Sequence, residues 1–545
     1  MKKQLYLIVG LFVLFSMLLG ACAPAAAPTQ APAEAAAATE APAASEPTKA
    51  PEAPAATEAP AEPAAPVNST VDKPLIISGP ADIPSLDPHT FNGMFQRSIG
   101  YWIFDVLVMN SQDGKGSNPE LATEWTRVDP YTWEFKLAEN AMFQNGEKFN
   151  ADAVIYSFER MQSEEFKKYN ALFYETPFQE IKKIDDYTVQ IITSEPFNDL
   201  LWYLSRTFIV PPGYYSSTSS EEVAINPVGS GPFKFVEWVK DDHITVVANE
   251  EYFQGAPIVK NAMVRVIPEP SQRVNELVTG NVDLITNLPA DLAKQTDSEN
   301  SRLVSYKTLR KMHLNLQLNN EYLGNQMVRD ALQMAVDRQT IIDTLLGGNT
   351  YVLKSTVNEP NNDASLPALT FDPEKAKALL AEAGYPDGFE VVLQTTAGAF
   401  GSDKEIAQLL AQDLENIGIK VQLEVIEENK LWELLETHDH PGMLYLGLGT
   451  YNLPIKELNT FYSTDIDNAG NYNSPEFDAA VDAMKIETDE AKRLEYSYTA
   501  QQILWKDMPW VYLWRLPGFQ GQSNRLNLLP YADGYIDIWQ AELTE

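Results

Sequence analysis

Residues 312–318 read Met-His-Leu-Asn-Leu-Gln-Leu, in which apolar and polar side chains alternate without exception. This pattern predicts a half-buried β-strand. After a turn, Asn325 is placed to cap a helix that runs to Leu346, where a glycine pair ends it. Predicted strands and turns dominate before this stretch, whereas helices and short strands alternate after it. We therefore interpret Met312–Leu346 as a crossing between two domains, where a hinge can lie.

The length and composition of the chain limit the possible classes of protein. A chain of 545 residues is too long for one hydrophobic core, so two or three domains are expected. With 76 acidic and 40 basic residues, nucleic acid is not an expected partner, because binding phosphates requires a basic face. Five histidines and one cysteine make a Cys/His metal site improbable and exclude an intrachain disulfide. We expect no cofactor and a monomer.

The amino terminus has the features of a targeting segment. Met1–Ala21 combines two early lysines with the apolar run Leu5–Leu19 and small residues after it. The only cysteine, Cys22, follows Leu-Gly-Ala, and this arrangement resembles the bacterial lipobox. The resemblance implies that Cys22 is lipidated and anchors the chain to the outer face of the cytoplasmic membrane. The alternative is an ordinary signal peptide with a cysteine at that position by chance.

The segment after Cys22 has a low-complexity composition. Residues 23–66 consist almost entirely of Ala, Pro, Glu and Thr and contain no aromatic residue, Leu or Ile. Such a sequence cannot bury a core. We predict a disordered tether over residues 22–72 that holds a folded body away from the membrane.

Hydrophobic patterning predicts alternating strands and helices through the body from Lys73 onward. Asn145-Gly146 predicts a tight turn, and Asn150 or Asp152 the start of a helix. The predicted strands are 75–78, 132–137, 264–267, 282–285, 390–393, 421–425, 443–448 and 511–514, and the predicted helices are 97–108, 271–279, 373–383, 403–417, 476–486 and 491–506.

Four motifs in this body resemble one known family. They are Leu121–Arg160 (LATEW…TWEFKLAENAMFQNGEKFNADAVIYSFER), Ser85–Pro88, Asn226–Phe235 (NPVGSGPFKF) and Met327–Ile341 (MVRDALQMAVDRQTI). Their order and spacing are similar to those of the extracellular solute-binding proteins of family 5. Members of that family are the peptide, nickel and oligosaccharide receptors of ABC importers. The resemblance covers about residues 73–524.

The resemblance implies an α/β fold of the periplasmic-binding-protein type II (cluster C), with two lobes joined by two hinge crossings. An extra subdomain is expected within the first lobe. The implied domains are a lipoprotein signal peptide (1–21), a lipidated tether (22–72), lobe I (73–311, with the extra subdomain at about 110–225), lobe II (312–508) and a return to lobe I (509–545).

The same resemblance guides the choice of ligand. Dipeptide-binding relatives place an aspartate for the peptide amino group after the strand similar to Met443–Leu448, but Gly447–Pro454 contains none. Their arginine for the peptide carboxylate has no counterpart in Thr395–Gly401. Both absences favour a longer peptide held by its backbone, or a neutral ligand such as an oligosaccharide.

The candidate ligand-binding residues lie at the ends of predicted strands. The alternative for each is a structural role, and core or hinge packing is the favoured interpretation of Phe400, Tyr445 and Trp514. If Asp82 faced the cleft, it could replace the missing acid. The candidates are Asp82, Ile83, Pro84, Phe400, Tyr445, Gly449, Thr450, Tyr451, Asn452 and Trp514.

The sequence thus predicts a lipid-anchored receptor that captures a solute, an oligopeptide in the first instance, and delivers it to an ABC permease powered by a separate ATPase. An oligosaccharide is the alternative ligand. A secreted glycosidase-like enzyme is the alternative of another class, although no nucleophile elbow or P-loop is present. An extracellular chaperone or sensor also stays open. His438-Asp439-His440 is interpreted as a solvated loop.

Closure of two lobes predicts a change of shape. A ligand that contacts both lobes only when they are shut favours the compact state, so it should lower the radius of gyration measured by small-angle X-ray scattering. A panel of tightly bound ligands that leaves the radius unchanged would contradict this prediction.

Overall fold

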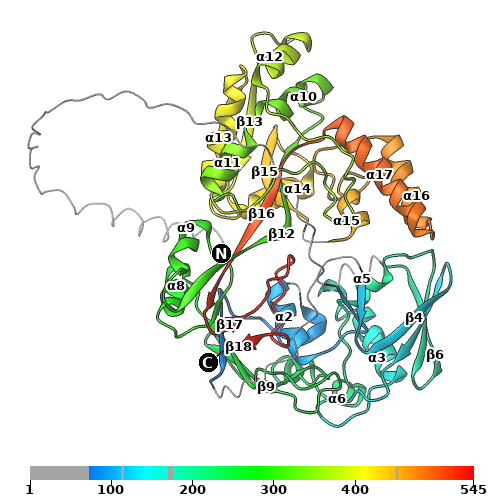
Figure 1. Ribbon diagram of the computed structural model, residues 1–545. Helices are drawn as coiled ribbons and strands as arrows, with labels where there is room; N and C mark the ends of the chain where they lie inside the picture. The colour runs from blue at the N-terminus through cyan, green and yellow to red at the C-terminus, as the bar shows by residue number, and fades with distance from the viewer. Residues whose placement is uncertain (1–72, 92, 112–115, 170–175, 450–451, 545) are drawn as a thin grey trace, which may run out of the picture. The chain divides into compact units, whose positions relative to one another are not determined.

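The computed structural model describes residues 73–544 apart from 92, 112–115, 170–175 and 450–451 (Figure 1). Its largest element is a ten-stranded mixed sheet. In spatial order the sheet contains β14 (Lys420–Val425), β13 (Glu390–Thr395), β15 (Met443–Leu448), β12 (Ser301–Leu316), β16 (Trp510–Ser523), β11 (Leu284–Ile285), β1 (Leu75–Gly79), β10 (Asn261–Val266), β9 (His243–Ala248) and β8 (Phe233–Val239).

Two long antiparallel strands, β12 and β16, connect the halves of this sheet (Figure 1). Their pairing runs from Ser301 opposite Ser523 to Asn315 opposite Trp510, with register shifts on either side of Lys311. The apolar core on one side of the crossing lies between residues 312 and 514, and the cores on the other side are built from residues 75–293 and 519–543. The fold is therefore two-lobed with two crossings.

Lobe I carries a second sheet with a core of its own. The four antiparallel strands in the order β4-β5-β7-β6 pack against α3, and buried residues from Leu107 to Ile209 form that core. The remaining elements of lobe I are small sheets and short helices. The elements are β4 (Ala122–Asp129), β5 (Thr132–Leu137), β6 (Phe178–Asp185), β7 (Thr188–Thr193), β2 (Val108–Asn110), β3 (Ser117–Pro119), β17 (Leu526–Asn527), β18 (Glu542–Leu543), α2 (Met94–Ile103), α3 (Ala151–Gln162), α5 (Leu200–Leu204), α6 (Pro212–Ser217), α7 (Ser220–Val223), α8 (Pro270–Val278) and α9 (Ala290–Ala293), with 3-10 turns at Pro88–Thr90, Lys167–Tyr169 and Lys294–Thr296.

Helices surround the strands of lobe II (Figure 1). Within the described residues, no helix of either lobe combines the length and apolar character needed to cross a bilayer. The helices of lobe II are α10 (Gln326–Ala335), α11 (Arg338–Leu345), α12 (Pro373–Glu382), α13 (Asp403–Asn416), α14 (Glu428–Thr437), α15 (Pro454–Asn459), α16 (Pro475–Ile486) and α17 (Glu490–Asp507).

Local signals predicted several elements correctly. The side chain of Asn150 accepts hydrogen bonds from two backbone amides at the start of α3, and Asp372 accepts one from Lys375 N (2.9 Å) at the start of α12. Gly146 adopts φ +88°, as the predicted turn requires. The predicted strands at 132–137 and 443–448 match β5 and β15 residue for residue. These signals succeed because each acts within a few residues of chain.

The prediction that 312–318 is half-buried was wrong. β12 begins at Ser301, and every residue from Lys311 to Leu316 is buried. β15 and β16 flank the strand within the sheet, while α-helices and loops cover both faces, so the polar residues of the alternation are buried as well. His313, for example, stacks on Trp510 with ring centroids 3.5 Å apart.

The single helix predicted from Asn325 to Leu346 is two helices. Val336 leaves the helical conformation, and the Asp337 carboxylate accepts a hydrogen bond from Thr340 N (3.1 Å) to start α11. The buried Arg338 guanidinium donates to the carbonyls of Gln333 (2.8 Å) and Val336 (3.2 Å). These bonds satisfy carbonyl groups that the break leaves without helical partners.

Two further predictions differ from the structure. The helix predicted over 97–108 ends at Ile103, because Phe104 is extended. The loop predicted to be solvated contains His440, which is only 2% exposed, and burial lowers the pKa of His440 to about 4. Among the described residues, no group of His, Cys, Asp and Glu is arranged to hold a metal ion.

A buried charged network lies at the crossing. The ammonium of Lys311 forms an ion pair with Glu457 of α15, and both side chains are at least 97% buried. Glu457 Oε2 also accepts from Asn358 N (3.0 Å), while Asn358 Oδ1 accepts from Arg515 Nη2 (2.7 Å) on β16. The network therefore ties both crossing strands to α15 and to the loop that contains Asn358.

Removing one member of the pair should destabilise the protein strongly. Glu457→Gln or Lys311→Met leaves an uncompensated buried group, so each should lower the free energy of unfolding by about 3–5 kcal/mol. The double variant should lose less than the sum of the two. Urea unfolding followed by tryptophan fluorescence measures these losses.

The exposed pair Lys430 and Glu433 is the control, and its removal should cost under about 1 kcal/mol. If the Lys311 and Glu457 variants lower the free energy of unfolding by no more than this, the buried ion pair does not stabilise the protein as expected.

Candidate functional site between the lobes

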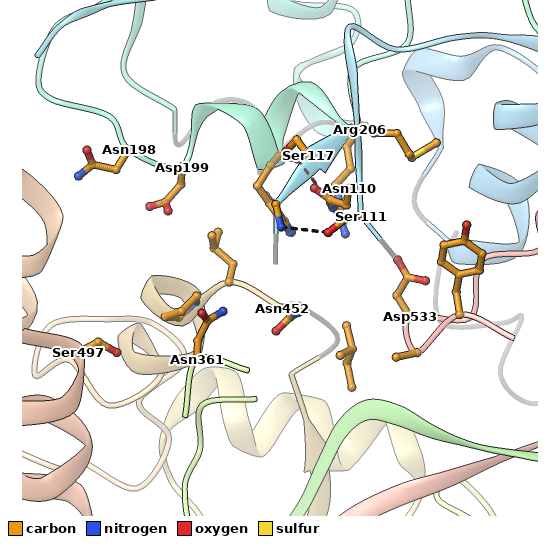
Figure 2. Close-up of a pocket in the computed structure, with 18 of the residues that line it drawn as sticks. Asn110, Ser111, Ser117, Asn198, Asp199, Arg206, Asn361, Asn452, Ser497 and Asp533 are labelled. Atoms are coloured by element: carbon orange, nitrogen blue, oxygen red, sulfur yellow. Dashed lines mark hydrogen bonds between the residues drawn. The ribbon is translucent and has the colours of Figure 1, made fainter. Parts of the chain in front are cut away.

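A cavity of about 300 Å³ is lined by residues from both lobes, and we name it the interlobe cavity (Figure 2). The residues labelled in Figure 2 are mostly amides, hydroxyls and charged groups, while tyrosine, tryptophan, methionine and leucine side chains complete the walls. The lining residues of lobe I are Tyr101, Met109, Asn110, Ser111, Gly116, Ser117, Asn198, Asp199, Trp202, Arg206, Leu309, Tyr531, Ala532, Asp533 and Tyr535, and those of lobe II are Asn361, Asn452, Leu453, Pro454, Met484, Glu490, Arg493, Leu494 and Ser497.

Short elements of lobe I position the wall that this lobe contributes to the interlobe cavity. The β2–β3 hairpin presents Asn110 and Ser111, and Ser111 Oγ accepts a hydrogen bond from Gly116 N (3.0 Å) across its loop. Asp199 stands at the start of α5, next to Asn198. The guanidinium of Arg206 lies over the ring of Trp202, 3.8 Å from its centroid. This stacking holds a cation at the cavity edge without an acidic partner being needed.

Lobe II contributes its wall through three separate segments. Asn361 follows the loop of Asn358, Asn452 and Leu453 precede α15, and Ser497 lies in α17. Asn452 is partly exposed and its side chain is drawn at the cavity in Figure 2. Amide groups both donate and accept hydrogen bonds, so this wall suits a ligand that carries both kinds of group.

The two lobes are also joined directly beside the cavity. Arg493 of α17 forms an ion pair with Asp199, and Asn198 Nδ2 donates to the carbonyls of Lys485 (3.0 Å) and Glu487 (2.7 Å) at the end of α16. Trp202 packs with apolar residues of α15–α17 in one buried cluster. These contacts form a latch between α5 and the α16–α17 pair.

Comparison with known proteins identifies the family. Residues 117–469 match the family described as bacterial extracellular solute-binding proteins, family 5 middle. The chain belongs to this family. The members of this family are solute-binding proteins and not enzymes. The family of extracytoplasmic binding proteins expected from the sequence motifs is thus confirmed.

Individual relatives of this family-5 chain carry different names. Heme-binding protein A of Haemophilus influenzae is 27% identical over 463 residues, which cover 78% of this chain and 83% of that protein. Oligopeptide-binding protein AppA of Bacillus subtilis is 28% identical over 414 residues, covering 70% and 75%. The solved structure of DppA from Helicobacter pylori in complex with the peptide STSA is 25% identical with a TM-score of 0.68, covering 87% of this chain and 98% of that chain.

The structure places Asp82, Ile83 and Pro84 outside the cavity lining. The Asp82 carboxylate accepts hydrogen bonds from Trp238 Nε1 (3.0 Å) and Asp241 N (2.7 Å), so it holds β8 and the turn after it. Ile83 is buried in the lobe I core, and Pro84 is exposed. Asp82 is therefore engaged within lobe I and does not line the interlobe cavity.

Three aromatic candidates belong to the hydrophobic core of lobe II. Phe400, Tyr445 and Trp514 are each at most 2% exposed, and none of them lines the cavity. Burial raises the pKa of Tyr445 well above its usual value. Tyr445 and Trp514 face the core from β15 and β16, which lie inside the sheet, and Phe400 packs into the same core from the loop between β13 and α13.

The predicted segment 449–452 is partly located. Asn452 lines the interlobe cavity, while Thr450 and Tyr451 lie outside the described residues. Gly449 adopts φ +76°, and a Cβ there would come within 2.6 Å of Lys311 Nζ. The positive φ and the close approach of Lys311 both favour a glycine at position 449.

The sequence analysis missed most of the lining. Five polar lining residues come from distant segments of the chain, and no sequence motif marks them as a group. They are Asn110, Asn198, Asp199, Asn361 and Ser497. The predicted strand end before Asn452 was the only local sequence signal for a lining residue, and Asn452 does line the cavity.

The latch should contribute measurable coupling between the lobes. In a double-mutant cycle of Asp199→Asn and Arg493→Gln, urea unfolding should give an interaction energy of about 1–3 kcal/mol, because both side chains are largely buried. The exposed pair Glu374 and Lys377 is the matched control and should give under about 0.5 kcal/mol. Equal coupling in the two pairs would show that Asp199 and Arg493 do not latch the lobes.

Proposed function

We propose that the protein is the substrate-binding component of an ABC importer and that it captures an oligopeptide between its lobes. The observation that carries this proposal is the interlobe cavity, whose walls come from both sides of the crossing. A ligand in such a cavity gains its full set of contacts only when the lobes are together, so binding favours the closed state.

The chemistry of the walls supports a peptide. Asn110, Asn361 and Asn452 can each donate to a main-chain carbonyl and accept from a main-chain amide. Met109 and Met484 add flexible apolar surface that adapts to different side chains. Backbone recognition with adaptable walls gives affinity without demanding one sequence.

Two relatives support the same ligand class. AppA of Bacillus subtilis is named as oligopeptide-binding, and DppA of Helicobacter pylori holds the peptide STSA. Another relative is named as heme-binding, so the family comparison alone does not select peptides over other solutes. The hydrogen-bonding side chains of the cavity are what favour a peptide.

The proposal extends to location and delivery. Cys22 would carry the lipid anchor and residues 23–72 the tether, both outside the described residues. A monomer held in this way on the outer face of the cytoplasmic membrane would deliver its solute to a permease. A separate ATPase would supply the energy.

A thermal-shift screen of the full chain in detergent tests the ligand class. Mixed tetrapeptides should raise the unfolding temperature, because a ligand at about 100 times its dissociation constant adds roughly 2.7 kcal/mol to the native state. Mixed oligosaccharides and hemin form the other two arms.

Asn452→Ala should reduce the peptide-induced shift, whereas Asn416→Ala, at the end of α13 and outside the cavity lining, should preserve it. A shift with oligosaccharides or hemin alone would replace the proposed ligand class. No shift in any arm would contradict the function.

A further inference from the structure

Helix α5 packs into both lobes, through different sides. Leu200 and Leu204 lie one helical turn apart and are fully buried in the core that the four-stranded sheet of lobe I shares with α3. Trp202 and Tyr203, each 7% exposed, are instead buried in a cluster whose other buried members come from residues 353–512. The short helix is therefore anchored in lobe I and inserts two aromatic side chains into lobe II.

The side chain of Asn198 directs its hydrogen bonds to the latch. Its Nδ2 donates to the carbonyls of Lys485 (3.0 Å) and Glu487 (2.7 Å), and its Oδ1 accepts from Arg127 Nη1 on β4. Since an amide nitrogen carries two hydrogens, both donors are engaged, although Asn198 lines the interlobe cavity (Figure 2). The two carbonyls lie at the carboxyl end of α16, the partially negative end of a helix, where a donor is stabilising.

Charged groups of both lobes meet next to Asn198. Asp199 forms its ion pair with Arg493 of α17, and the two side chains are 10% and 20% exposed. Burial and the positive charge of Arg493 lower the pKa of Arg127, whereas the charges of Asp129 and Asp199 raise it. Because Arg127 belongs to lobe I and Arg493 to lobe II, the two guanidinium groups would repel each other across the interface without the carboxylate of Asp199.

The contacts of the latch do not need a solute. They join one lobe to the other directly, and Arg127 and Tyr203 lie outside the lining of the interlobe cavity. Such contacts stabilise the closed state, in which α5 touches α16 and α17, by the same amount whatever solute is bound. The apparent dissociation constant of a solute is its intrinsic value divided by the fraction of chains in the binding-competent state. Latch residues can therefore alter the affinity without touching the solute.

We propose that Asn198 and Tyr203 are positioning residues that set the solute affinity of the protein by holding α5 against lobe II. Weakening either contact lowers the population of the closed state, so every solute is bound more weakly by the same factor. A residue that touches the solute would instead change the affinities by factors that depend on the solute. The affinity test of this inference rests on the proposed peptide function.

Two variants of the latch test the proposal. Asn198→Asp replaces the donor to two carbonyls by a carboxylate, which the negative end of α16 repels. Tyr203→Leu removes the ring from the lobe II cluster and keeps an apolar side chain. Each variant should weaken the binding of two tetrapeptide mixtures, one of Ala, Leu and Ser and one of Asn, Gln and Thr, by at least about fivefold and by the same factor for both. Isothermal titration calorimetry of the full chain in detergent measures the dissociation constants.

Matched controls separate the latch from a general loss of stability. Asn416→Asp adds the same charge at the end of α13 in lobe II, and Phe135→Leu removes a buried ring from the core of lobe I. Both should keep the dissociation constants within about twofold, because each change lies within one lobe. Phe135→Leu should still lower the unfolding temperature.

Three results would overturn the proposal. The first is unchanged affinity in both latch variants. The second is equal weakening by Phe135→Leu and Tyr203→Leu, which loss of stability alone would explain. The third is a factor that differs between the two mixtures in Asn198→Asp, which would make Asn198 a direct solute contact. If Asn198→Asp does not fold, Tyr203→Leu decides the question.

Failure of the peptide function can be separated from failure of the latch. If neither mixture binds the unaltered chain, the peptide function is contradicted, and spin labels test the latch without a solute. Ile184→Cys on β6 and Ile466→Cys in lobe II place the labels at exposed positions, in a Cys22→Ser chain. Double electron–electron resonance measures the distance between them. Asn198→Asp should broaden the distribution towards longer distances, and Asn416→Asp should leave it unchanged. An unchanged distribution in Asn198→Asp overturns the proposal.

Discussion

The ion pair between Lys311 and Glu457 is the interaction on which the site of this protein depends. Lys311 lies where the pairing of β12 and β16 shifts register, and Glu457 lies in α15. The residues that open α15 line the interlobe cavity, and the loop of Asn358, bound to the same carboxylate, leads to Asn361 in the cavity wall. This buried charge pair thus fixes the crossing strands β12 and β16 relative to the lobe II wall of the interlobe cavity.

The charged groups beside the interlobe cavity differ in environment from the buried carboxyl groups of lobe I. Near the interlobe cavity, Asp199 pairs with Arg493 and Arg206 stacks on Trp202, and Glu490 and Asp533 also line the cavity. In lobe I, burial raises the pKa of Asp105 and Asp537 to about 6 and raises that of Glu120 well above its usual value. The ion pair between Asp199 and Arg493 joins the lobes, whereas at the three lobe I carboxyls burial disfavours the negatively charged forms.

Much of the fold was predictable from the sequence because its signals are local. Asn150 and Asp372 cap helices through bonds to amides two or three residues away, and the alternation in 132–137 identifies β5. The break at Val336 was not predictable, since the carbonyls it exposes are satisfied by Arg338, a basic residue that a helix would place on its surface. The burial of His313 depends on strands that arrive from far along the chain.

The candidate site shows the same division. The sequence by itself determined the family, the order of most elements and the position of Asn452 at a strand end. It could not show that Asp82 is engaged by Trp238, or that Asp105 and Asp537 share one cavity. Only the tertiary structure decided these points. The physical reason is that hydrophobic periodicity and capping act over a few residues, whereas burial of a charge and its choice of partner depend on segments hundreds of residues apart.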